Sequence, residues 1–315
     1  MGIGDARREE WQDVARRVAR GIRRRVLEHV VRSNGGYLSQ ACSSAEILAT
    51  LYTRVLAIGP SAAPPVPLAF PGAPGAGIPR SLSGVAHARS STGAAYNGPR
   101  APELDRFFFS PVHYALVLYA TLVEVGRMAL EGLEAFNEDG STVEMIGAEH
   151  SPGIETTAGS LSQALSVAGG VALARKLRRE PGRVWVFLSD GEFQEGQTWE
   201  AFAALSFHGI DNLGVFADAN GQQVDGRMDR VMAVEPLAER LRAFGALVRE
   251  VDGHDPEALA AAADGIGKGK PLVVLARTDP CRGIAILRSR APKLHYVRFK
   301  DEQERAAYRA ALEAF

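Results

Sequence analysis

Hydrophobic positions in the second half of the chain alternate between two periods, and this alternation predicts an α/β fold. Residues 184–188 form a continuous apolar run of strand length, typical of a strand buried on both faces, and further strands are predicted at 213–216, 247–251 and 272–275. Apolar residues at helical spacing between and after these runs predict helices at 199–207, 237–244 and 256–262. Because strands alternate with helices, we expect right-handed crossovers and a parallel sheet with helices on both faces.

The first half of the chain has a helical pattern that one long segment interrupts. Helices are predicted over 10–32, through 45–51, over 114–133 and over 161–177. Between them, residues 57–104 contain nine of the seventeen prolines and show no hydrophobic period. Such a segment is typical of an irregular loop with a function or of disorder. We therefore expect one domain over residues 1–315, with an irregular excursion at about 57–104.

Two polar motifs follow consecutive predicted strands, at the edge where parallel sheets bind ligands. Asp190 and Gly191 come directly after the first strand, and Asn220 follows the next one, thirty positions later. A carboxylate, an amide oxygen and a loop carbonyl such as that of Gln222 are ligands of the kind that hold Mg²⁺ while a phosphate completes the coordination. Each motif alone is more typical of a simple turn. Their placement one strand–helix–strand unit apart makes a metal–diphosphate site as well supported as a pair of simple turns.

Residues 183–226 resemble the thiamine-diphosphate motif of transketolases, which runs from Gly-Asp-Gly to an asparagine one strand–helix–strand unit later. The match includes Asp190-Gly191-Glu192, Glu195-Gly196-Gln197, Trp199-Glu200-Ala201, Asp211-Asn212-Leu213 and Val224-Asp225-Gly226. Residues 152–163 resemble the family segment that meets the aminopyrimidine ring. Residues 105–113 and 278–296 resemble the family segments that carry active-site histidines. The resemblance covers nearly the whole chain outside 57–104.

This resemblance implies the thiamine-diphosphate-binding fold and a set of site residues. The metal ligands would be Asp190, Asn220 and the Gln222 carbonyl, holding Mg²⁺ or, as a substitute, Ca²⁺ or Mn²⁺. The Gly159 carbonyl would accept the exocyclic amine of the cofactor, with Leu161 beside the pyrimidine. The complete set of implied cofactor-binding residues is Gly159, Leu161, Asp190, Gly191, Glu192, Asn220, His113 and His295. The implied catalytic residues are His113, His295, His150 and Tyr37.

Several positions depart from the family pattern. Ser189 stands where the family has the first glycine of Gly-Asp-Gly, and Ser162 and Ala164 replace two further glycines. Tyr37 occupies the position of a family histidine. With an ordinary pKa of ~10, tyrosine donates a hydrogen bond but does not shuttle protons near pH 7 as imidazole does. His150 lies near the place of another family histidine, without the family's spacing, and is a catalytic candidate on that basis.

By resemblance we expect a transferase that moves a two-carbon ketol unit from a ketose, expected to be phosphorylated, to an aldose. A 2-oxo acid decarboxylating subunit is an alternative, since Tyr37 removes an imidazole that handles sugars. A non-catalytic homologue is a second alternative, against which the intact Asp190 and Asn220 argue. The forty residues after Leu275 are too few for a second parallel sheet. We therefore expect a separately encoded partner with the pyrimidine-binding domain, in an α₂β₂ assembly.

Composition adds little to this interpretation. A net charge of −1, with 36 basic and 37 acidic residues, gives no indication of a nucleic-acid or anionic membrane partner. The two cysteines, Cys42 and Cys281, are interpreted as packing residues in a reducing compartment. No apolar run approaches the ~20 residues that span a bilayer, and the N-terminus lacks a signal-peptide pattern, which favours the cytoplasm. Four histidines match no motif and are interpreted as surface or capping residues: His29, His87, His208 and His254.

Overall fold

The computed structural model of the chain describes residues 9–69 and 92–315. At its centre lies a five-stranded sheet in the order β1-β2-β3-β7-β6, in which every neighbouring pair is parallel. The strands of this sheet are β1 (Arg106–Phe109), β2 (Val184–Ser189), β3 (Leu213–Ala219), β6 (Leu247–Asp252) and β7 (Leu272–Arg277). A separate antiparallel pair consists of β4 (Gln222–Gln223) and β5 (Gly226–Arg227). The predicted parallel sheet is confirmed.

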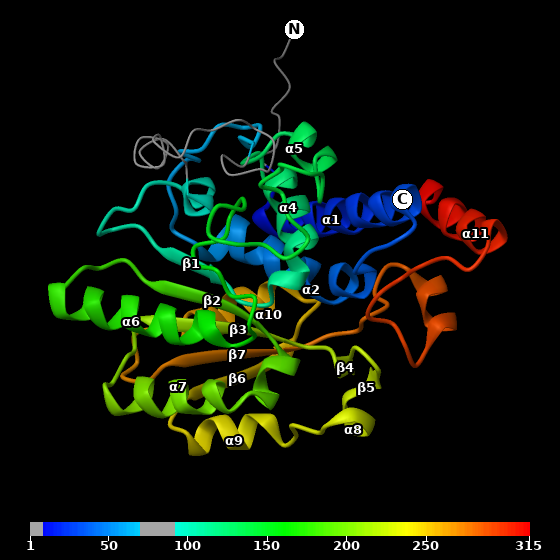
Figure 1. The fold of residues 1–315 in the computed structure, drawn as a ribbon. Coiled ribbons are helices and arrows are strands. Elements are labelled where there is room, and N and C mark those ends of the chain that lie inside the picture. Colours follow the sequence, from blue (N-terminus) through cyan, green and yellow to red (C-terminus); the bar gives the residue numbers. More distant parts are fainter. Residues whose placement is uncertain (1–8, 70–91) are drawn as a thin grey trace, which may run out of the picture.

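Helices cover both faces of this sheet, as predicted (Figure 1). One layer contains α1 (Trp11–Ser33), α2 (Leu38–Thr50), α4 (Ala115–Glu124) and α10 (Pro256–Ala263). The opposite layer contains α6 (Gln163–Arg178), α7 (Gly196–Phe207) and α9 (Leu237–Ala243). Short or peripheral helices are α5 (Leu130–Glu134), α8 (Met228–Val231) and α11 (Glu302–Glu313).

The strands bury both faces because their side chains alternate between two apolar cores. On β2, Trp185 and Phe187 pack into the core shared with α1, α2 and α4, whereas Val186 and Leu188 pack into the core shared with α6 and α7. Every residue of β2 and β3 is buried. The uninterrupted apolar run in the sequence is therefore a central strand, covered by helices on each side.

One helix and one strand differ from the sequence predictions. The helix predicted over 114–133 is divided into α4 and α5, because Gly126 takes a left-handed conformation (φ 71°) and its amide closes a turn onto the Val123 carbonyl. The sequence pattern also does not identify β1. Its apolar run, Phe107–Phe109, is only three residues long, shorter than the runs that mark the other strands.

The helix predicted over 161–177 also has a different start and a different face. It begins at Gln163 because Ser162 is a left-handed N-cap residue (φ 71°). The buried face that contains Ala168 does not extend to Leu177, which is 75% exposed. Nine positions at 3.6 residues per turn place these two side chains half a turn apart, so Leu177 points away from the core.

The histidines outside the motifs occupy unlike environments. His208 is exposed at the C-terminus of α7, as predicted. The interpretation of His29 and His254 as surface residues is wrong. His29 is buried edge-on against Phe136, and burial lowers its pKa to about 4. The side chain of His254 is 8% exposed and is held by two hydrogen bonds. His87 lies outside the described residues.

The described parts of the proline-rich excursion, 57–69 and 92–104, are attached to the domain by specific bonds. They contain one 3₁₀ helix, Gly93–Asn97. The guanidinium of Arg127 donates to the carbonyls of Tyr96 and Gly59, each at 2.8 Å. Residues 70–91 of the predicted excursion lie outside the described residues.

A single buried carboxylate fixes the edge of the sheet where this excursion returns. Asp105, directly before β1, accepts hydrogen bonds from the amides of Ala57 (2.9 Å) and Arg183 (2.8 Å). It also accepts bonds from the Arg183 guanidinium (2.7 Å) and the Trp185 indole (3.1 Å). The Asp105 side chain is only 2% exposed. If the carboxylate were removed, little water could reach these donors to take its place.

Asp105→Ala should therefore lower the free energy of unfolding by about 3 kcal/mol, the order expected when one member of a buried ion pair is removed. Urea unfolding followed by tryptophan fluorescence measures this change. The matched control is Asp225→Ala, whose carboxylate is 78% exposed beside Lys293. This control should change stability by less than about 0.5 kcal/mol. Equal losses in the two variants would contradict the role given to Asp105.

Candidate functional site

The two polar motifs predicted from the sequence lie side by side at the carboxyl edge of the sheet. Ser189, at the end of β2, lies opposite Asp218 near the end of β3. Asp190 begins a short 3₁₀ turn after β2 and is 3% exposed. Its Oδ2 accepts the amide of Gly221, at 2.7 Å, in the loop that Asn220 opens. The strand–helix–strand spacing thus brings the predicted carboxylate and amide ligands together.

Asp218 is the hub of this edge, although no motif in the sequence identifies it. It is fully buried, and its Oδ1 accepts the Thr278 hydroxyl at 2.5 Å. Its Oδ2 accepts the Ser43 hydroxyl at 2.6 Å, the Asn220 amide at 3.0 Å and the Tyr114 hydroxyl at 3.3 Å. The donors come from α2, the turn before α4 and the end of β7. One carboxylate therefore joins the main elements that surround the site.

Asp218 also orients the amide of Asn220. The Nδ2 group of Asn220 donates to Asp218 and to the Tyr114 hydroxyl at 3.1 Å, and this assigns the other atom of the amide as oxygen. That Oδ1 accepts the Gln222 amide at 2.9 Å in a local turn and keeps a second lone pair. Sequence reasoning identified Asn220 but not Asp218, which holds its amide and lies two positions earlier.

The electrostatics of this edge favour a bound cation. Burial raises the pKa of Asp190 well above its ordinary value, and the nearby Asp218 raises it further. Burial also raises the pKa of Asp218, although the four hydrogen bonds to it act in the opposite direction. Two buried carboxylates close to each other destabilise their own charged forms. A divalent cation between the carboxylate of Asp190 and neighbouring neutral oxygens would remove that cost, so the donor set fits Mg²⁺.

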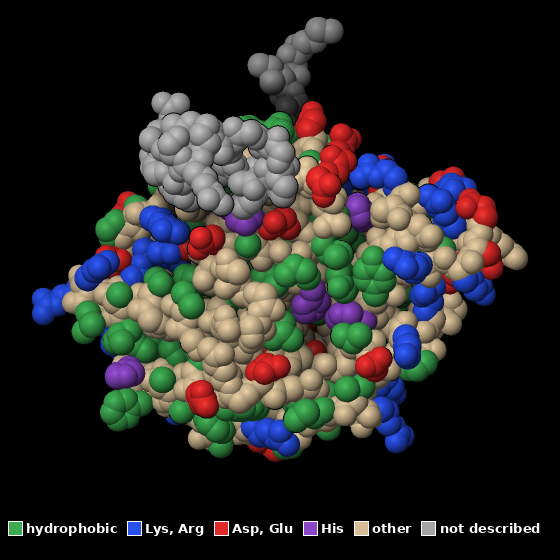
Figure 2. Space-filling view, in the orientation of Figure 1, with side chains coloured by type: hydrophobic (Ala, Val, Ile, Leu, Met, Phe, Trp, Pro, Cys, Tyr) green, Lys and Arg blue, Asp and Glu red, His purple; other side chains and the backbone are tan. Residues whose placement is uncertain are grey.

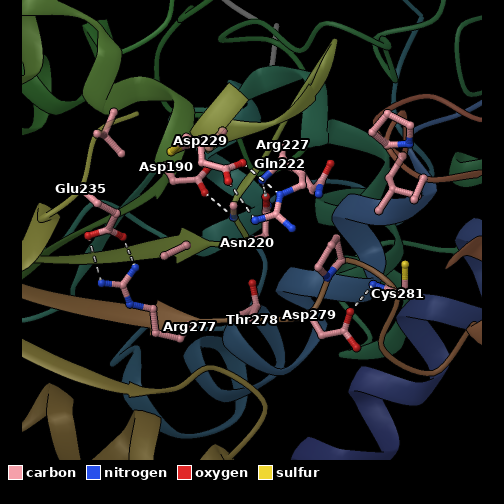
Figure 3. Close-up of a pocket in the computed structure, with 18 of the residues that line it drawn as sticks. Asp190, Asn220, Gln222, Arg227, Asp229, Glu235, Arg277, Thr278, Asp279 and Cys281 are labelled. Atoms are coloured by element: carbon pink, nitrogen blue, oxygen red, sulfur yellow. Dashed lines mark hydrogen bonds and ion pairs between the residues drawn. The ribbon is translucent and has the colours of Figure 1, made fainter. Parts of the chain in front are cut away.

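A cavity of about 690 Å³ opens beside these residues (Figure 3). Asp190, Asn220 and Gln222 line one side, and Thr278 and Asp279 lie across from them. Ion-paired arginines surround the cavity, and each is held by at least one carboxylate: Arg227 by Asp229, Arg277 by Glu235 and Glu250, and Arg288 by Asp279. Within the described residues, no group of three or more His, Cys, Asp or Glu side chains could bind a metal on its own. A mixed set of carboxylate, amide and carbonyl oxygens is the alternative that this edge provides.

Three of the four predicted catalytic residues form an aromatic cluster. The rings of His113 and His295 have centroids 5.2 Å apart, and Tyr37 lies edge-on to both, at 5.7 and 5.3 Å. Tyr296 packs against Tyr37 at 5.0 Å. His113 directly precedes Tyr114, which donates to Asp218, so the cluster is attached to the same hub. Figure 2 shows histidine and hydrophobic side chains gathered at the middle of this face.

Both imidazoles of the cluster are neutral near pH 7. Burial, with His295 nearby, lowers the pKa of His113 to about 3. Burial also lowers the pKa of His295. The amide of Gln40 lies 3.1 Å from His295 Nδ1. Because that amide nitrogen can only donate, the proton of the neutral His295 ring is on Nε2. The cluster can donate and accept hydrogen bonds but has no positive charge of its own.

Glu192 connects two loops of the site. It is completely buried, and its carboxylate accepts the amides of Ser162 (2.9 Å) and Ser189 (2.8 Å) and the hydroxyl of Ser110. These bonds tie the loop before α6 to the turn that carries Asp190. The donors that Glu192 meets in this structure are all interior protein groups.

The remaining predicted residues lie on loops around the same edge. Gly159 is exposed, with open space where a side chain would stand, and Leu161 is half-buried in the same loop. Gly191 has the side chain of Gln223 about 3.0 Å from the position of an added Cβ, so a larger residue there would crowd the site. His150 pairs with Glu144 at 2.9 Å, a contact in its own loop rather than in the aromatic cluster.

Comparison with known proteins places this site in a family. The sequence matches the family described as "Transketolase, thiamine diphosphate binding domain" over residues 65–291. A transketolase family protein of Sinorhizobium fredii is 31% identical over 295 residues, which cover 92% of each chain. The 6-deoxy-6-sulfo-D-fructose transketolase subunit SqwG of a Clostridium species is 29% identical, covering 91% of this chain and 92% of that protein. A subunit of the apulose-4-phosphate transketolase of Actinobacillus succinogenes is 29% identical, covering 93% and 95%.

Solved structures agree on the fold. Transketolase from Campylobacter jejuni superimposes with a TM-score of 0.70 at 20% identity, covering 96% of this chain and 46% of that one. A transketolase from Pichia stipitis gives a TM-score of 0.70 at 21% identity, covering 96% and 44%. The chain thus spans less than half of these full-length enzymes but nearly all of the shorter relatives.

The chain belongs to the transketolase family and contains its thiamine diphosphate-binding domain. The predictions of this family, of the thiamine-diphosphate-binding α/β fold and of a transketolase-like transferase are therefore confirmed. None of the helices in the described part of the chain combines the length and the apolar character that a bilayer crossing requires.

Asp190→Asn should stabilise the cofactor-free chain near neutral pH by about 1 kcal/mol, a gain typical of substitutions that relieve a functional site. Asparagine still accepts the Gly221 amide but removes one of two like charges. Because the folded-state pKa of Asp190 lies above its unfolded value, burying this carboxyl costs stability at neutral pH. That cost decreases as the pH falls below the folded-state pKa and is gone below the unfolded-state pKa, so the variant and the wild type should converge in acid. Urea unfolding at a series of pH values measures the difference. A variant less stable than wild type near pH 7 would contradict this electrostatic assignment.

Proposed function

We propose that this chain is the thiamine-diphosphate-binding subunit of a two-subunit transketolase that transfers a two-carbon ketol unit from a phosphorylated ketose to an aldose. The observation that carries the proposal is the Asp190–Asn220 edge, built around buried acceptors that a divalent cation would stabilise. The length of the chain supports its role as one of two subunits. It spans nearly all of two relatives named as transketolase subunits and under half of the full-length enzymes.

In the proposed site, Asp190, Asn220 Oδ1 and the Gln222 carbonyl hold Mg²⁺. Gly191 gives the diphosphate close access to the backbone, and the loop with Gly159 and Leu161 receives the pyrimidine. When bound, the cofactor supplies a carbanion that cleaves and forms carbon–carbon bonds next to a carbonyl. The protein's task is to orient the cofactor and the substrate and to neutralise the diphosphate.

Neutral His113 and His295 suit a polyhydroxylated substrate. Their rings are half-buried beside Tyr37, where less water competes for a bond to a sugar oxygen. Because neither ring carries a charge near pH 7, they position hydroxyls through hydrogen bonds and give the substrate phosphate no ion pair. His150, on the Glu144 pair, is proposed to reach the substrate from the neighbouring loop. The phosphate would then be bound by residues of the partner subunit.

Tyr37 is the feature that favours a second function. Burial, with Tyr296 nearby, raises its pKa, which makes it a hydrogen-bond donor only near neutral pH. A 2-oxo acid substrate has fewer hydroxyls to handle than a ketose, so a decarboxylating subunit would tolerate this residue. The relatives of similar length that are named as transketolase subunits favour ketol transfer over this alternative.

The proposed partner supplies the pyrimidine-binding domain and completes two active sites in an α₂β₂ assembly. The layer with α6 and α7 exposes apolar side chains that an interface would cover: Val167 is 44% exposed, Leu177 75% and Phe207 85%. A hollow of about 410 Å³ lies between these helices, lined by small and apolar residues such as Leu165 and Gly169 and by the polar Gln197, Glu200 and His208. Obligate interfaces resemble a core cut in half, which matches this surface.

We further propose a cytoplasmic enzyme that does not act on nucleic acid. Cys42 and Cys281 are both free thiols and both buried, as expected of packing residues in a reducing compartment. The nearly balanced charge of the chain gives no indication of a nucleic-acid partner.

Asp190→Ala should abolish Mg²⁺-dependent binding of thiamine diphosphate by the reconstituted complex, because the remaining neutral oxygens cannot balance a divalent ion beside a diphosphate. Asn220→Ala should weaken binding strongly, and Asp225→Ala, on the exposed surface nearby, should leave it unchanged. Titration calorimetry with and without Mg²⁺ measures all three variants. Unchanged cofactor affinity in Asp190→Ala would show that the metal site is elsewhere.

Tyr37→Phe should lower kcat/KM by roughly 10- to 100-fold, the order expected for one lost polar contact to the substrate. Since the phenol remains protonated throughout, the loss should be nearly constant between about pH 6 and 8. Steady-state rates with a ketose phosphate donor over this range provide the measurement. If the substitution removes a titration step from the pH profile, Tyr37 acts as an acid–base group and its role as a simple donor is wrong.

The chain alone should show no ketol transfer, and activity should appear when the partner subunit is added. By resemblance, a glutamate of the pyrimidine-binding domain activates the cofactor, and the described elements of this chain form one parallel-sheet domain without a second. The assay compares the chain, the partner and the mixture, with Mg²⁺, thiamine diphosphate and either a ketose phosphate plus an aldose or a 2-oxo acid. Turnover by the chain alone near ~10 s⁻¹, a typical enzyme rate, would overturn the two-subunit proposal. Turnover of the 2-oxo acid alone would select the alternative function.

A further inference from the structure

A buried row of three polar side chains, Arg23, Glu46 and His254, connects α1 and α2 with the turn that follows β7. The guanidinium of Arg23 donates to the Glu46 carboxylate (Nη1 to Oε1, 2.7 Å) and to the Cys42 carbonyl (3.0 Å). On its other side, Glu46 Oε2 lies 2.9 Å from His254 Nδ1. His254 Nε2 in turn accepts the backbone amide of Asp279 at 2.8 Å. The side chains of Arg23, Glu46 and His254 are 7%, 10% and 8% exposed, so little water reaches these bonds.

The partners of His254 determine its tautomer. A backbone amide can only donate, so Nε2 must be the unprotonated nitrogen. Glu46 accepts at the other nitrogen. Burial acts to raise the pKa of Glu46, but the hydrogen bonds from His254 and Arg23 outweigh it and the pKa lies below its ordinary value. A charged carboxylate accepts only, so Nδ1 carries the proton. His254 is therefore a neutral bridge that donates to α2 and accepts from the turn.

This bridge closes a ring of contacts around the hub of the site. The turn held by His254 begins with Thr278, which donates to Asp218, and Asp279 and Cys281 of the same turn line the cavity. The helix held by Glu46 also carries Ser43, the second hydroxyl on Asp218. Asp218 thus joins α2 and the turn at one point, and the Glu46–His254 pair joins them at another. These two side-chain attachments act together with the Thr278 amide, which donates to the Ala219 carbonyl at 3.3 Å, to fix the position of the turn.

We propose that His254 is a positioning residue for the cofactor site: through its Nε2 acceptor it holds the 278–281 turn against α2 and thereby sets the wall of the cavity opposite Asp190 and Asn220 (Figure 3). This inference rests on the proposed function only for the identity of the ligand in the cavity. The geometry of the turn can be tested without any ligand.

Three substitutions separate the hydrogen bond from simple packing. His254→Gln is expected to place an amide oxygen near the position of Nε2 and so to keep the acceptor for the Asp279 amide. His254→Leu has a similar volume but no acceptor. His254→Asn keeps a donor for Glu46 and is too short to reach Asp279, so it serves if the leucine variant does not fold. The control is His208→Leu, at an exposed position on α7.

The first measurement uses the cofactor-free chain. Nitrogen NMR of histidine-labelled protein should show His254 as the neutral tautomer protonated on Nδ1. Hydrogen exchange should show the Asp279 amide protected in wild type, His254→Gln and His208→Leu, and exchanging faster in His254→Leu and His254→Asn. A different tautomer, or equal protection in the glutamine and leucine variants, would overturn the proposal whatever the chain binds.

The second measurement is the affinity for thiamine diphosphate with Mg²⁺ in the reconstituted complex. His254→Leu and His254→Asn should lose roughly 10- to 100-fold, the range typical for residues that position metal ligands indirectly. The affinity of His254→Gln should remain close to that of wild type. If His254 acted only through packing, the glutamine and leucine variants would not differ in this way. Leucine equal to or better than glutamine would refute the positioning role. If wild type itself binds no cofactor, the proposed function fails. The tautomer and hydrogen-exchange results still test whether His254 holds the turn.

Discussion

The structure of the site depends on one buried carboxylate that several elements share. Asp218 receives donors from α2, the turn before α4, its own loop and the end of β7. A buried charge without partners would be strongly destabilising, so these segments can approach only in the arrangement that satisfies it. The same constraint orients Asn220 and brings Asp190 to a second buried charge. The metal site proposed for this edge therefore depends on the contacts that satisfy Asp218.

Stability and function oppose each other at this edge. Burial keeps Asp190 and Asp218 away from water, which favours a tight, oriented site and disfavours their charged forms while the site lacks a cation. Ser162 shows a similar compromise. It is held in a left-handed conformation that favours glycine, and its hydroxyl donates to the Glu192 carbonyl at 2.9 Å. Such local costs are common where a protein prepares a site for a ligand.

The sequence allowed the parallel sheet, its edge and the Asp190–Asn220 pair to be predicted, because apolar runs and the strand–helix–strand spacing are local features. The roles of Asp218 and His254 could not be predicted in this way. The Ser43 donor to Asp218 is 175 positions away in the sequence, and the Glu46 partner of His254 is 208 positions away. Tyr37, His113 and His295 were identified only by resemblance. Contacts between distant segments leave no periodic signal, so the packing that turns motif residues into a site appears only in the folded chain.

A crystal structure of the chain with its partner, thiamine diphosphate and Mn²⁺ would test the central claim most directly. Anomalous scattering locates the metal without any assumption about its ligands. We expect one metal per site, bound to the Asp190 carboxylate, Asn220 Oδ1 and the Gln222 carbonyl at about 2.1–2.3 Å, with cofactor phosphate oxygens completing the coordination. A metal bound elsewhere, or a cofactor diphosphate seated at another edge of the sheet, would contradict the assignment.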